Sequence, residues 1–318
     1  MYIEQAYKGL TDAWRYIVGA ILIFVAWQIL GAIPLIAGLF IKVDGLENFP
    51  ADIPGMVELL GNNLFLFLML ISFAIGLVAV FIGSKYLHNL SLKNLTTSRS
   101  KIDWKRFWFI FILWGGITST LVVIDYLFIS PESYEWNFKL YPFLILLTLG
   151  ILLLPLQTSF EEYLFRGYGM HFLGTVSKNK WLPLVVTSIT FGLMHIFNPE
   201  VATLGPIIMV YYIGTGLFLG IVTLMDDGLE LALGFHFANN LFTALLVTAD
   251  WTALQTDSIL IDISDPKEMV ISEIIVPVLI IFPILLFILA KKYKWSNWKD
   301  KLLGPVVEPA KEDYKILE

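Results

Sequence analysis

The 318-residue chain contains no cysteine, which excludes disulfides, thiol nucleophiles and zinc–thiolate sites. Charged residues are scarce, at 15% of the sequence, whereas an ordinary soluble domain has about a quarter. The net charge of −6 offers no basic footprint for nucleic acid, so we expect no nucleic-acid partner. The sequence also shows no low-complexity segment and no convincing internal repeat.

Apolar residues dominate instead, at 57% with a mean hydropathy of +0.75. A membrane-spanning helix needs roughly 20 mostly apolar residues. The first apolar run, Tyr16 to Ile41, is far longer than the roughly 7–15 apolar residues of a signal peptide, which predicts a retained helix. The sequence therefore predicts an all-α, polytopic membrane helix bundle of about eight transmembrane helices. The candidate spans are residues 16–40, 64–86, 107–129, 142–173, 181–197, 204–225, 229–248 and 270–290.

The fourth span is too long for one straight crossing, at about 48 Å against an apolar core of about 30 Å. Pro155 lies inside it and is expected to break or kink the helix. We divide the chain into residues 1–140 with helices 1–3, residues 141–250 with a catalytic core of helices 4–7, and residues 251–318 with helix 8 and a cytoplasmic tail. The polar end of that tail, 300–318, is expected to be flexible.

Lysine and arginine orient the predicted bundle. They are concentrated in the loops 87–106 and 174–180 and in the segment after the last span, which lie on one side, while the opposite loops are acidic. The positive-inside rule makes the basic side cytoplasmic, together with both termini. We expect an integral protein of a bacterial cell membrane, because the chain is small and carries no organelle-targeting feature.

Ionisable residues at membrane depth are costly and are therefore functional candidates. Counted along the predicted helices, the polar groups of three spans lie in one slab near the midplane. His171, like His88, is instead expected near the cytoplasmic interface in a solvated role. The residues within the spans are Glu161, Glu162, Arg166, His171, His195 and His236, with Asn239 and Asn240 as neutral polar neighbours.

The first motif is Glu161-Glu162-x-x-x-Arg166. Glu162 and Arg166 are four residues apart on one helical face, with the acid first, which favours a structural ion pair. Glu161 is rotated by about 100° and is left as a free carboxylate that faces the bundle interior. A plain helix-stabilising salt bridge is the competing interpretation, and it leaves the second glutamate unexplained.

Two further motifs follow along the chain. Phe191-x-x-x-His195 lies in the fifth span, and His236-x-x-x-Asn240 lies in the seventh. Each alone is compatible with a hydrogen-bonded core histidine or with polar bonds between helices. The three motifs together favour a functional site.

Glutamate and histidine suit the activation of water, and a histidine with an asparagine suits the stabilisation of an oxyanion. No G-x-S-x-G motif is present. The chemistry indicated is hydrolysis of an acyl bond, and we expect a peptide bond. The alternative is a zinc site at Glu161, His195 and His236, although H-E-x-x-H is absent. We favour water activation without a metal or other cofactor.

The three motifs, in this order, resemble those of the CPBP family of CAAX-processing and bacteriocin-processing intramembrane endopeptidases, which are Abi-like and related to the Ras-converting CAAX protease. The resemblance implies that Glu161 and His195 activate the catalytic water. It implies that His236 and Asn240 stabilise the oxyanion, and that Glu162, Arg166 and Phe191 support the site structurally. The expected partners are the lipid bilayer and a peptide or protein substrate of CAAX or bacteriocin type, prenylated or membrane-embedded, cut near the cytoplasmic side. A membrane transporter and a non-catalytic scaffold or immunity protein are the alternatives.

Overall fold

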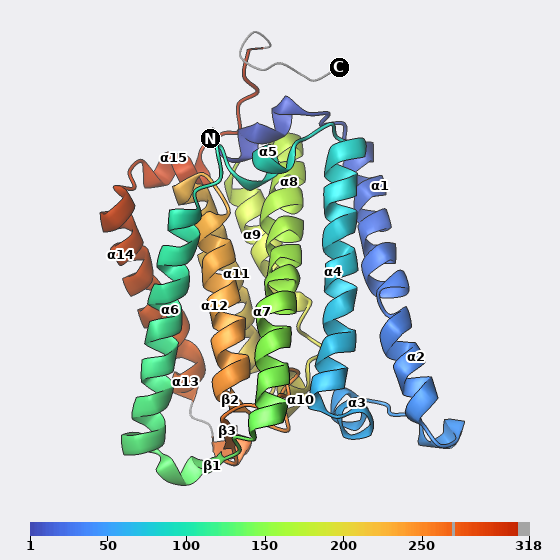
Figure 1. Ribbon diagram of the computed structural model, residues 1–318. Coiled ribbons are helices and arrows are strands. Elements are labelled where there is room, and N and C mark those ends of the chain that lie inside the picture. The colour runs from blue at the N-terminus through green and yellow to red at the C-terminus, as the bar shows by residue number, and fades with distance from the viewer. Residues whose placement is uncertain (269–270, 311–318) are drawn as a thin grey trace.

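The computed structural model describes residues 1–268 and 271–310, and its long helices run side by side between two ends (Figure 1). Within that part of the chain, six helical stretches are long and apolar enough to cross a membrane. They are Ala13–Lys42, Asn62–Tyr86, Trp104–Ile129, Leu140–Ser177, Pro206–Asp226 and Ile271–Tyr293. The predicted all-α, polytopic membrane bundle is confirmed.

The helices have the following bounds. They are α1 Ala13–Phe24, α2 Ile33–Lys42, α3 Ile53–Leu60, α4 Asn62–Tyr86, α5 Leu92–Thr96, α6 Trp104–Ile124, α7 Leu140–Glu162, α8 Met170–Ser177, α9 Trp181–Leu193, α10 Pro199–Leu204, α11 Met209–Asp226, α12 Glu230–Leu246, α13 Ile271–Val276, α14 Phe282–Tyr293 and α15 Trp298–Leu303. Short strands β1 Tyr134–Trp136, β2 Val247–Thr248 and β3 Leu260–Asp262 form a sheet in the order β1-β3-β2. In it β1 pairs antiparallel and β2 parallel to β3.

The fifth and seventh predicted spans are shorter than expected. Helix α12 has 17 residues and α9 has 13, so the prediction of a helix to residue 197 was wrong. The chain leaves α9 after Leu193 and reaches Asn198, whose ψ of 145° is extended. A residue before proline disfavours the helical region, and Pro199 follows, so α9 cannot continue into α10.

Pro155 does not break the fourth span, so the break that was expected as one of two outcomes, beside a kink, is absent. Helix α7 continues through it, and the helical stretch extends unbroken to Ser177. Inside a bilayer every backbone group must be bonded within the protein, which favours a continued helix over a break. The irregularity lies further on, at Tyr163–Gly169, where the turns widen into a π-helix directly after Glu162. Such wide turns often occur at functional sites.

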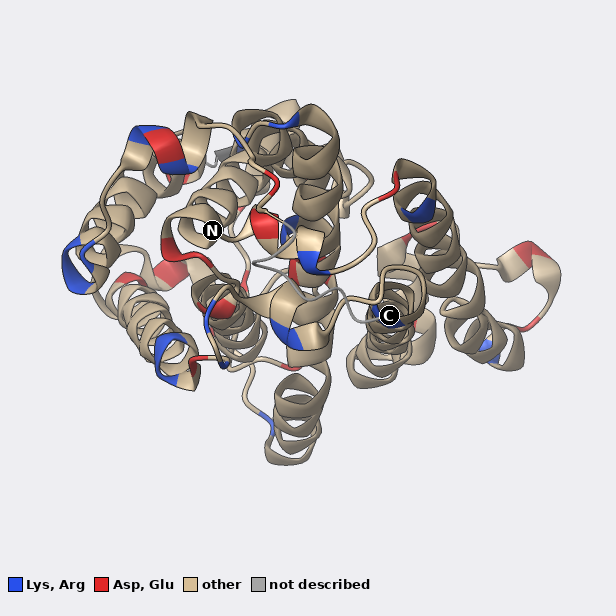
Figure 2. Cartoon of the chain, turned by 90° about the horizontal axis from the view of Figure 1, so that it is seen from above, with Lys and Arg blue, Asp and Glu red and all other residues tan. Residues whose placement is uncertain are grey.

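The bundle has two distinct ends (Figure 1). We call the end with the N-terminus, α5 and α15 the basic end, and the end with α3, α10 and the three strands the strand end. Seen from above the basic end, lysine and arginine lie on loops and helix ends around the bundle (Figure 2). Residues 311–318 of the predicted tail lie outside the described residues.

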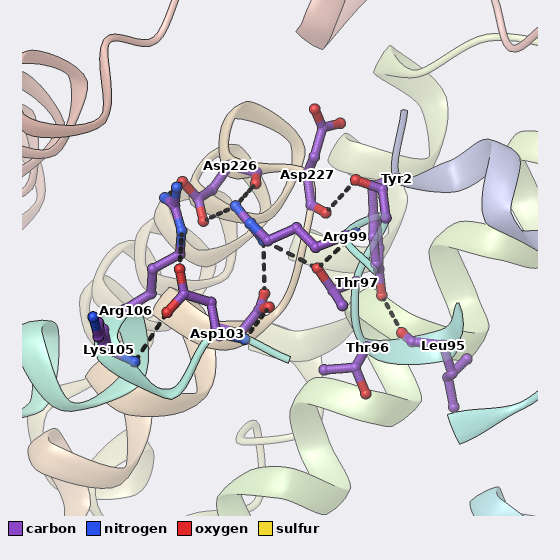
Figure 3. Close-up of polar contacts among 12 residues, drawn as sticks. Tyr2, Leu95, Thr96, Thr97, Arg99, Asp103, Lys105, Arg106, Asp226 and Asp227 are labelled. Atoms are coloured by element: carbon purple, nitrogen blue, oxygen red, sulfur yellow. Dashed lines mark hydrogen bonds and ion pairs between the residues drawn. The ribbon is translucent and has the colours of Figure 1, made fainter. Parts of the chain in front are cut away.

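A charged network closes the bundle at the basic end (Figure 3). Arg99 lies 2.8 Å from the Asp226 carboxylate and 3.0 Å from that of Glu230. Arg106 forms an ion pair with the same Asp226. Because Asp226 ends α11, Glu230 begins α12 and Arg106 lies in the first turn of α6, the network holds these three helix ends together.

Candidate active site

Two helices bring the first and third motifs together. Glu161 and Glu162 end α7, while His236 and Asn240 lie one turn apart on the packed helix α12. The ring of His236 lies between the two carboxylates. Its Nδ1 is 2.8 Å from Glu162 Oε1, and its Nε2 is 3.5 Å from Glu161 Oε2. All three side chains are buried.

Glu162 and Arg166 form a fully buried ion pair. The Arg166 guanidinium donates from Nη1 to Glu162 Oε1 over 3.0 Å and from Nη2 to the Gly216 carbonyl oxygen over 2.9 Å. It also lies 4.4 Å from the centre of the Phe191 ring, a cation–π contact. Both charges are 0% exposed, and a buried pair is stable only when its geometry and further bonds compensate for lost hydration. The pair leaves Glu162 able to accept a bond from His236 as well.

Glu161 is held by one oxygen only. Its Oε1 accepts a bond of 2.7 Å from Gln157 Nε2, four residues earlier on α7. Its Oε2 is buried and has no hydrogen-bond partner among the described residues. A carboxylate oxygen in this position is a site where a water proton can be accepted.

Gln157 also connects Glu161 to Asn240, and sequence reasoning missed it. Because an ionised carboxylate accepts only, the amide nitrogen of Gln157 must face Glu161. Its oxygen then accepts from Asn240 Nδ2 over 2.9 Å. The sequence does indicate it, because Gln157 lies one turn before Glu161 on the same helical face of an apolar span.

The amide chain continues behind Asn240. Asn239 donates from Nδ2 to Asn240 Oδ1 over 3.2 Å, and Trp114 donates from Nε1 to Asn239 Oδ1 over 3.2 Å. The oxygen of Asn240 therefore accepts from Asn239, which fixes the amide so that its nitrogen faces Gln157 and the site. An amide nitrogen carries two protons, so one remains for a ligand.

His195 lies in the turn beyond α9, not within a helix as predicted. Its Nδ1 is 2.9 Å from the Phe191 carbonyl oxygen. Since a carbonyl oxygen only accepts, Nδ1 carries a proton, and Nε2 of the neutral ring is an acceptor. The ring of Phe191 lies between the two imidazoles, with its centre 5.1 Å from that of His195 and 5.8 Å from that of His236.

Two further residues, Glu200 and Tyr212, hold His195 from the strand end. Tyr212 stacks on the His195 ring, with centroids 4.3 Å apart and planes 17° apart. The Tyr212 hydroxyl donates to the Glu200 carboxylate, which also accepts from the Ala253 backbone nitrogen over 2.9 Å. Sequence reasoning missed both, because Glu200 lies in the segment between the fifth and sixth predicted spans and Tyr212, within the sixth, was not counted among the polar residues at membrane depth.

These groups line one cavity of about 480 Å³. Glu161, Gln157 and Asn240 reach it from α7 and α12, while His195, Glu200 and Tyr212 reach it from the segment around α10 and from α11. His236 and Glu162 lie behind the cavity wall formed by Glu161.

The predicted zinc ligands are not gathered into one set. Glu161 and His236 are neighbours, but His195 is bonded to the carbonyl oxygen of Phe191 in the preceding helix α9 and stacked on Tyr212. Across residues 1–268 and 271–310, no three histidine, aspartate or glutamate side chains are grouped to hold a metal ion. This donor arrangement does not fit a three-ligand zinc site.

His171 and His88 lie outside the site. Both were expected to be solvated, and both are instead buried, at 0% and 2% exposure. His88 is bonded to the Leu10 carbonyl oxygen and the Tyr168 hydroxyl, and the His171 ring lies 5.1 Å from that of Tyr2. The N-terminal segment folds back over these rings and removes them from water.

Comparison with known proteins gives a match over the part of the chain that contains the site. Residues 139–242 match the protein-family model described as type II CAAX prenyl endopeptidase Rce1-like. This segment contains all three motifs, so the resemblance to the CAAX-processing endopeptidases is confirmed. The six apolar helical stretches make the protein an integral membrane protein. The uncharacterized protein YyaK of Bacillus subtilis (strain 168) is 28% identical over 243 residues, which cover 76% of this chain and 80% of that protein. No solved structure matches the chain.

Proposed function

We propose that the protein is an intramembrane endopeptidase in which Glu161 and His195 activate a water molecule. The observation that carries the proposal is Glu161 Oε2, which accepts no hydrogen bond from the described residues although His236 Nε2 lies 3.5 Å away. It belongs to a cavity-lining carboxylate that is linked through Gln157 to Asn240. The Rce1-like match supports a peptidase in general. The residue roles and the absence of a metal step are our inference.

In the proposed reaction, Glu161 Oε2 takes a proton from water while the neutral His195 Nε2 accepts the other water hydrogen and orients it. The water oxygen attacks the substrate carbonyl carbon and forms a tetrahedral intermediate. As the C–N bond breaks, Glu161 gives its proton to the leaving amine. The carboxylate is restored, and the products are a free acid and an amine.

His236 and Asn240 stabilise the oxyanion. Asn240 has one amide proton that is not used by Gln157, and it faces the site. The His236 ring faces Glu162 with Nδ1 and Glu161 with Nε2, so its proposed share in oxyanion stabilisation acts from behind Glu161.

An apolar cavity beside the site suits a lipidated or strongly apolar substrate. It has a volume of about 290 Å³ and is shared with the catalytic cavity at Trp27 and Met194. Its wall is almost wholly aliphatic and aromatic, and includes Phe24, Phe165 and Tyr168. This supports a CAAX-type prenylated substrate or an apolar bacteriocin-type peptide.

The test is cleavage by the detergent-purified protein of paired fluorogenic peptides, farnesylated and unmodified, with and without a chelator. Glu161→Gln is compared with Glu58→Gln, which changes an exposed glutamate on α3. The proposal expects cleavage by wild type and Glu58→Gln that survives the chelator and is lost in Glu161→Gln. Cleavage that is lost with chelator and restored by zinc contradicts the metal-free mechanism, and equal cleavage by both variants contradicts the role of Glu161. Substrate flux into proteoliposomes without a cleavage product would favour a transporter.

A further inference from the structure

We propose that the catalytic cavity is reached from the strand end, that this end faces away from the cytoplasm, and that the substrate is an extracytoplasmic polypeptide segment of neutral or positive charge. This inference rests on the proposed peptidase function for the nature of the substrate. The side of the membrane from which the cavity is reached is inferred from the structure alone and does not depend on activity.

The cavity wall extends from Glu161 to the strand end. Besides the site residues, it includes Ile53 of α3, β2, Asp262 of β3 and the segment 251–254. Along this path, Asn240 and Thr243 of α12 are followed by Val247 and Thr248 of β2. A polypeptide that enters between these walls meets both polar side chains, such as Thr243 and Thr248, and apolar ones before it reaches Glu161.

The other direction is closed by buried side chains. Glu162 and Arg166 are 0% exposed, and Phe160 and Phe191 are 0% and 2% exposed. Beyond this layer, the network of Arg99, Arg106, Asp226 and Glu230 holds α6, α11 and α12 together (Figure 3). Among the described residues, the cavity wall includes none from α5, α8 or α15, which lie at or run to the basic end.

Charge orients the two ends in the membrane. The strand end carries Lys42 at the end of α2, and Lys139 and Lys267 in its connecting segments. The basic end carries many more cations close to helix ends, including Lys93, Arg99, Lys101, Lys105, Arg106, Lys178, Lys180, Lys299 and Lys301 (Figure 2). An excess of lysine and arginine in short loops marks the cytoplasmic side. The strand end and the cavity mouth therefore face outward, which moves the expected cleavage from the cytoplasmic side to the opposite one.

The charged side chains in the cavity wall determine which substrate charge is favoured. Glu161, Glu200 and Asp262 line the cavity, and its described wall contains no lysine or arginine. Like charges placed together inside a water-poor cleft repel, so an acidic segment is disfavoured and a basic or neutral one is admitted. The substrate class that fits is an extended, uncharged or cationic segment exposed at the outer membrane surface.

The test uses single cysteines, because the native chain has none. Thr243→Cys lies in the cavity wall on an exposed position, Glu135→Cys is an exposed control at the strand end, and Lys101→Cys is an exposed control at the basic end. Each is treated with a charged, membrane-impermeant maleimide in intact bacterial cells and in inverted membrane vesicles. We expect Thr243→Cys and Glu135→Cys to react in cells and Lys101→Cys to react only in vesicles. The proposal would be overturned if Thr243→Cys reacted only in inverted vesicles, as Lys101→Cys is expected to do. It would also be overturned if Thr243→Cys reacted in neither preparation.

Labelling needs no catalysis, so it separates the two proposals. The expected pattern in a protein that cleaves nothing would refute the peptidase and leave outward access standing. If Thr243→Cys reacted only in inverted vesicles while the protein cleaved peptides, outward access would be refuted and the peptidase function would stand. For peptides cleaved in detergent, a flanking lysine should give a several-fold higher kcat/KM than a flanking glutamate, and equal values would overturn the charge preference.

Discussion

The ring of His195 stacks on that of Tyr212, and the hydroxyl of Tyr212 is anchored on Glu200. His195 follows the end of α9, so no helical backbone holds it on both sides. Its position is fixed by this stack and by the bond from Nδ1 to the Phe191 carbonyl oxygen. Tyr212 is therefore a positioning residue for the proposed water-binding histidine.

Removing the stacked ring should slow cleavage more than removing its hydroxyl. We expect Tyr212→Leu to lower kcat by about 10- to 100-fold, because a displacement of about 1 Å from the reactive geometry can cost about 10²-fold. Tyr212→Phe keeps the ring and should retain most of the activity. Steady-state peptide cleavage measures kcat and KM separately for both variants. A larger loss in Tyr212→Phe than in Tyr212→Leu would contradict the role of the stack.

Gln157 should matter through its two bonds and not through its size. Gln157→Leu removes the bonds to Glu161 and Asn240, so we expect kcat to fall by about 10- to 100-fold. Asn94→Leu, which changes an amide on the distant helix α5, is the matched control. The measurement is kcat at saturating peptide, beside the thermal midpoint in detergent. An unchanged kcat in Gln157→Leu would show that the amide chain does not position the site.

Asn240→Ala should impair the chemical step and leave binding largely intact. Loss of one oxyanion donor lowers kcat by about 10²–10³-fold in enzymes that use such donors. We expect that range with less than a few-fold change in KM, measured by peptide cleavage. A rise in KM with kcat unchanged would assign Asn240 to substrate binding instead.

Breaking the buried ion pair should destabilise the protein strongly. Arg166→Met leaves the Glu162 charge buried at 0% exposure without its cation, which costs about 3–5 kcal/mol when one partner of such a pair is removed. We expect a clear drop of the thermal unfolding midpoint in detergent.

The double variant Arg166→Met with Glu162→Gln should recover part of that loss, because it removes the unpaired charge. Activity should stay low in the double variant, since Glu162 also accepts a bond from His236. A double variant that is less stable than Arg166→Met would mean that the charges do not interact as the structure shows.

The sequence was sufficient to predict the helical bundle and to single out the residues of three motifs. Charged groups at membrane depth have few partners, so the pairing of Glu162 with Arg166 could be derived from a four-residue spacing alone. The contact between α7 and α12 could not be derived in this way, because it depends on how the helices pack. It brings His236 between Glu161 and Glu162, which no spacing along the chain specifies.

Other features of the site could not be predicted from the sequence, because the residues that form them are uncharged or depend on how the chain packs. Gln157 carries no charge, so a search for ionisable residues passed over it. Glu200 and Tyr212 become part of the site only because α9 ends early and the chain folds back towards α12. The π-helical turns at Tyr163–Gly169 likewise leave no clear mark in composition, and the rule that proline ends helices misplaced the irregularity at Pro155.

The early end of α9 also has a consequence for the supply of water. Thirteen helical residues extend about 20 Å, whereas the hydrocarbon layer is about 30 Å thick. After Leu193 the apolar helix ends, and the next segment places His195, Asn198 and Glu200 in the cavity wall. Lipid beside a helix of this length must thin or yield to headgroups. Each hydrolysed bond consumes one water molecule, and we expect that water to reach the cavity beside His195, Asn198 and Glu200, where the apolar helix has ended.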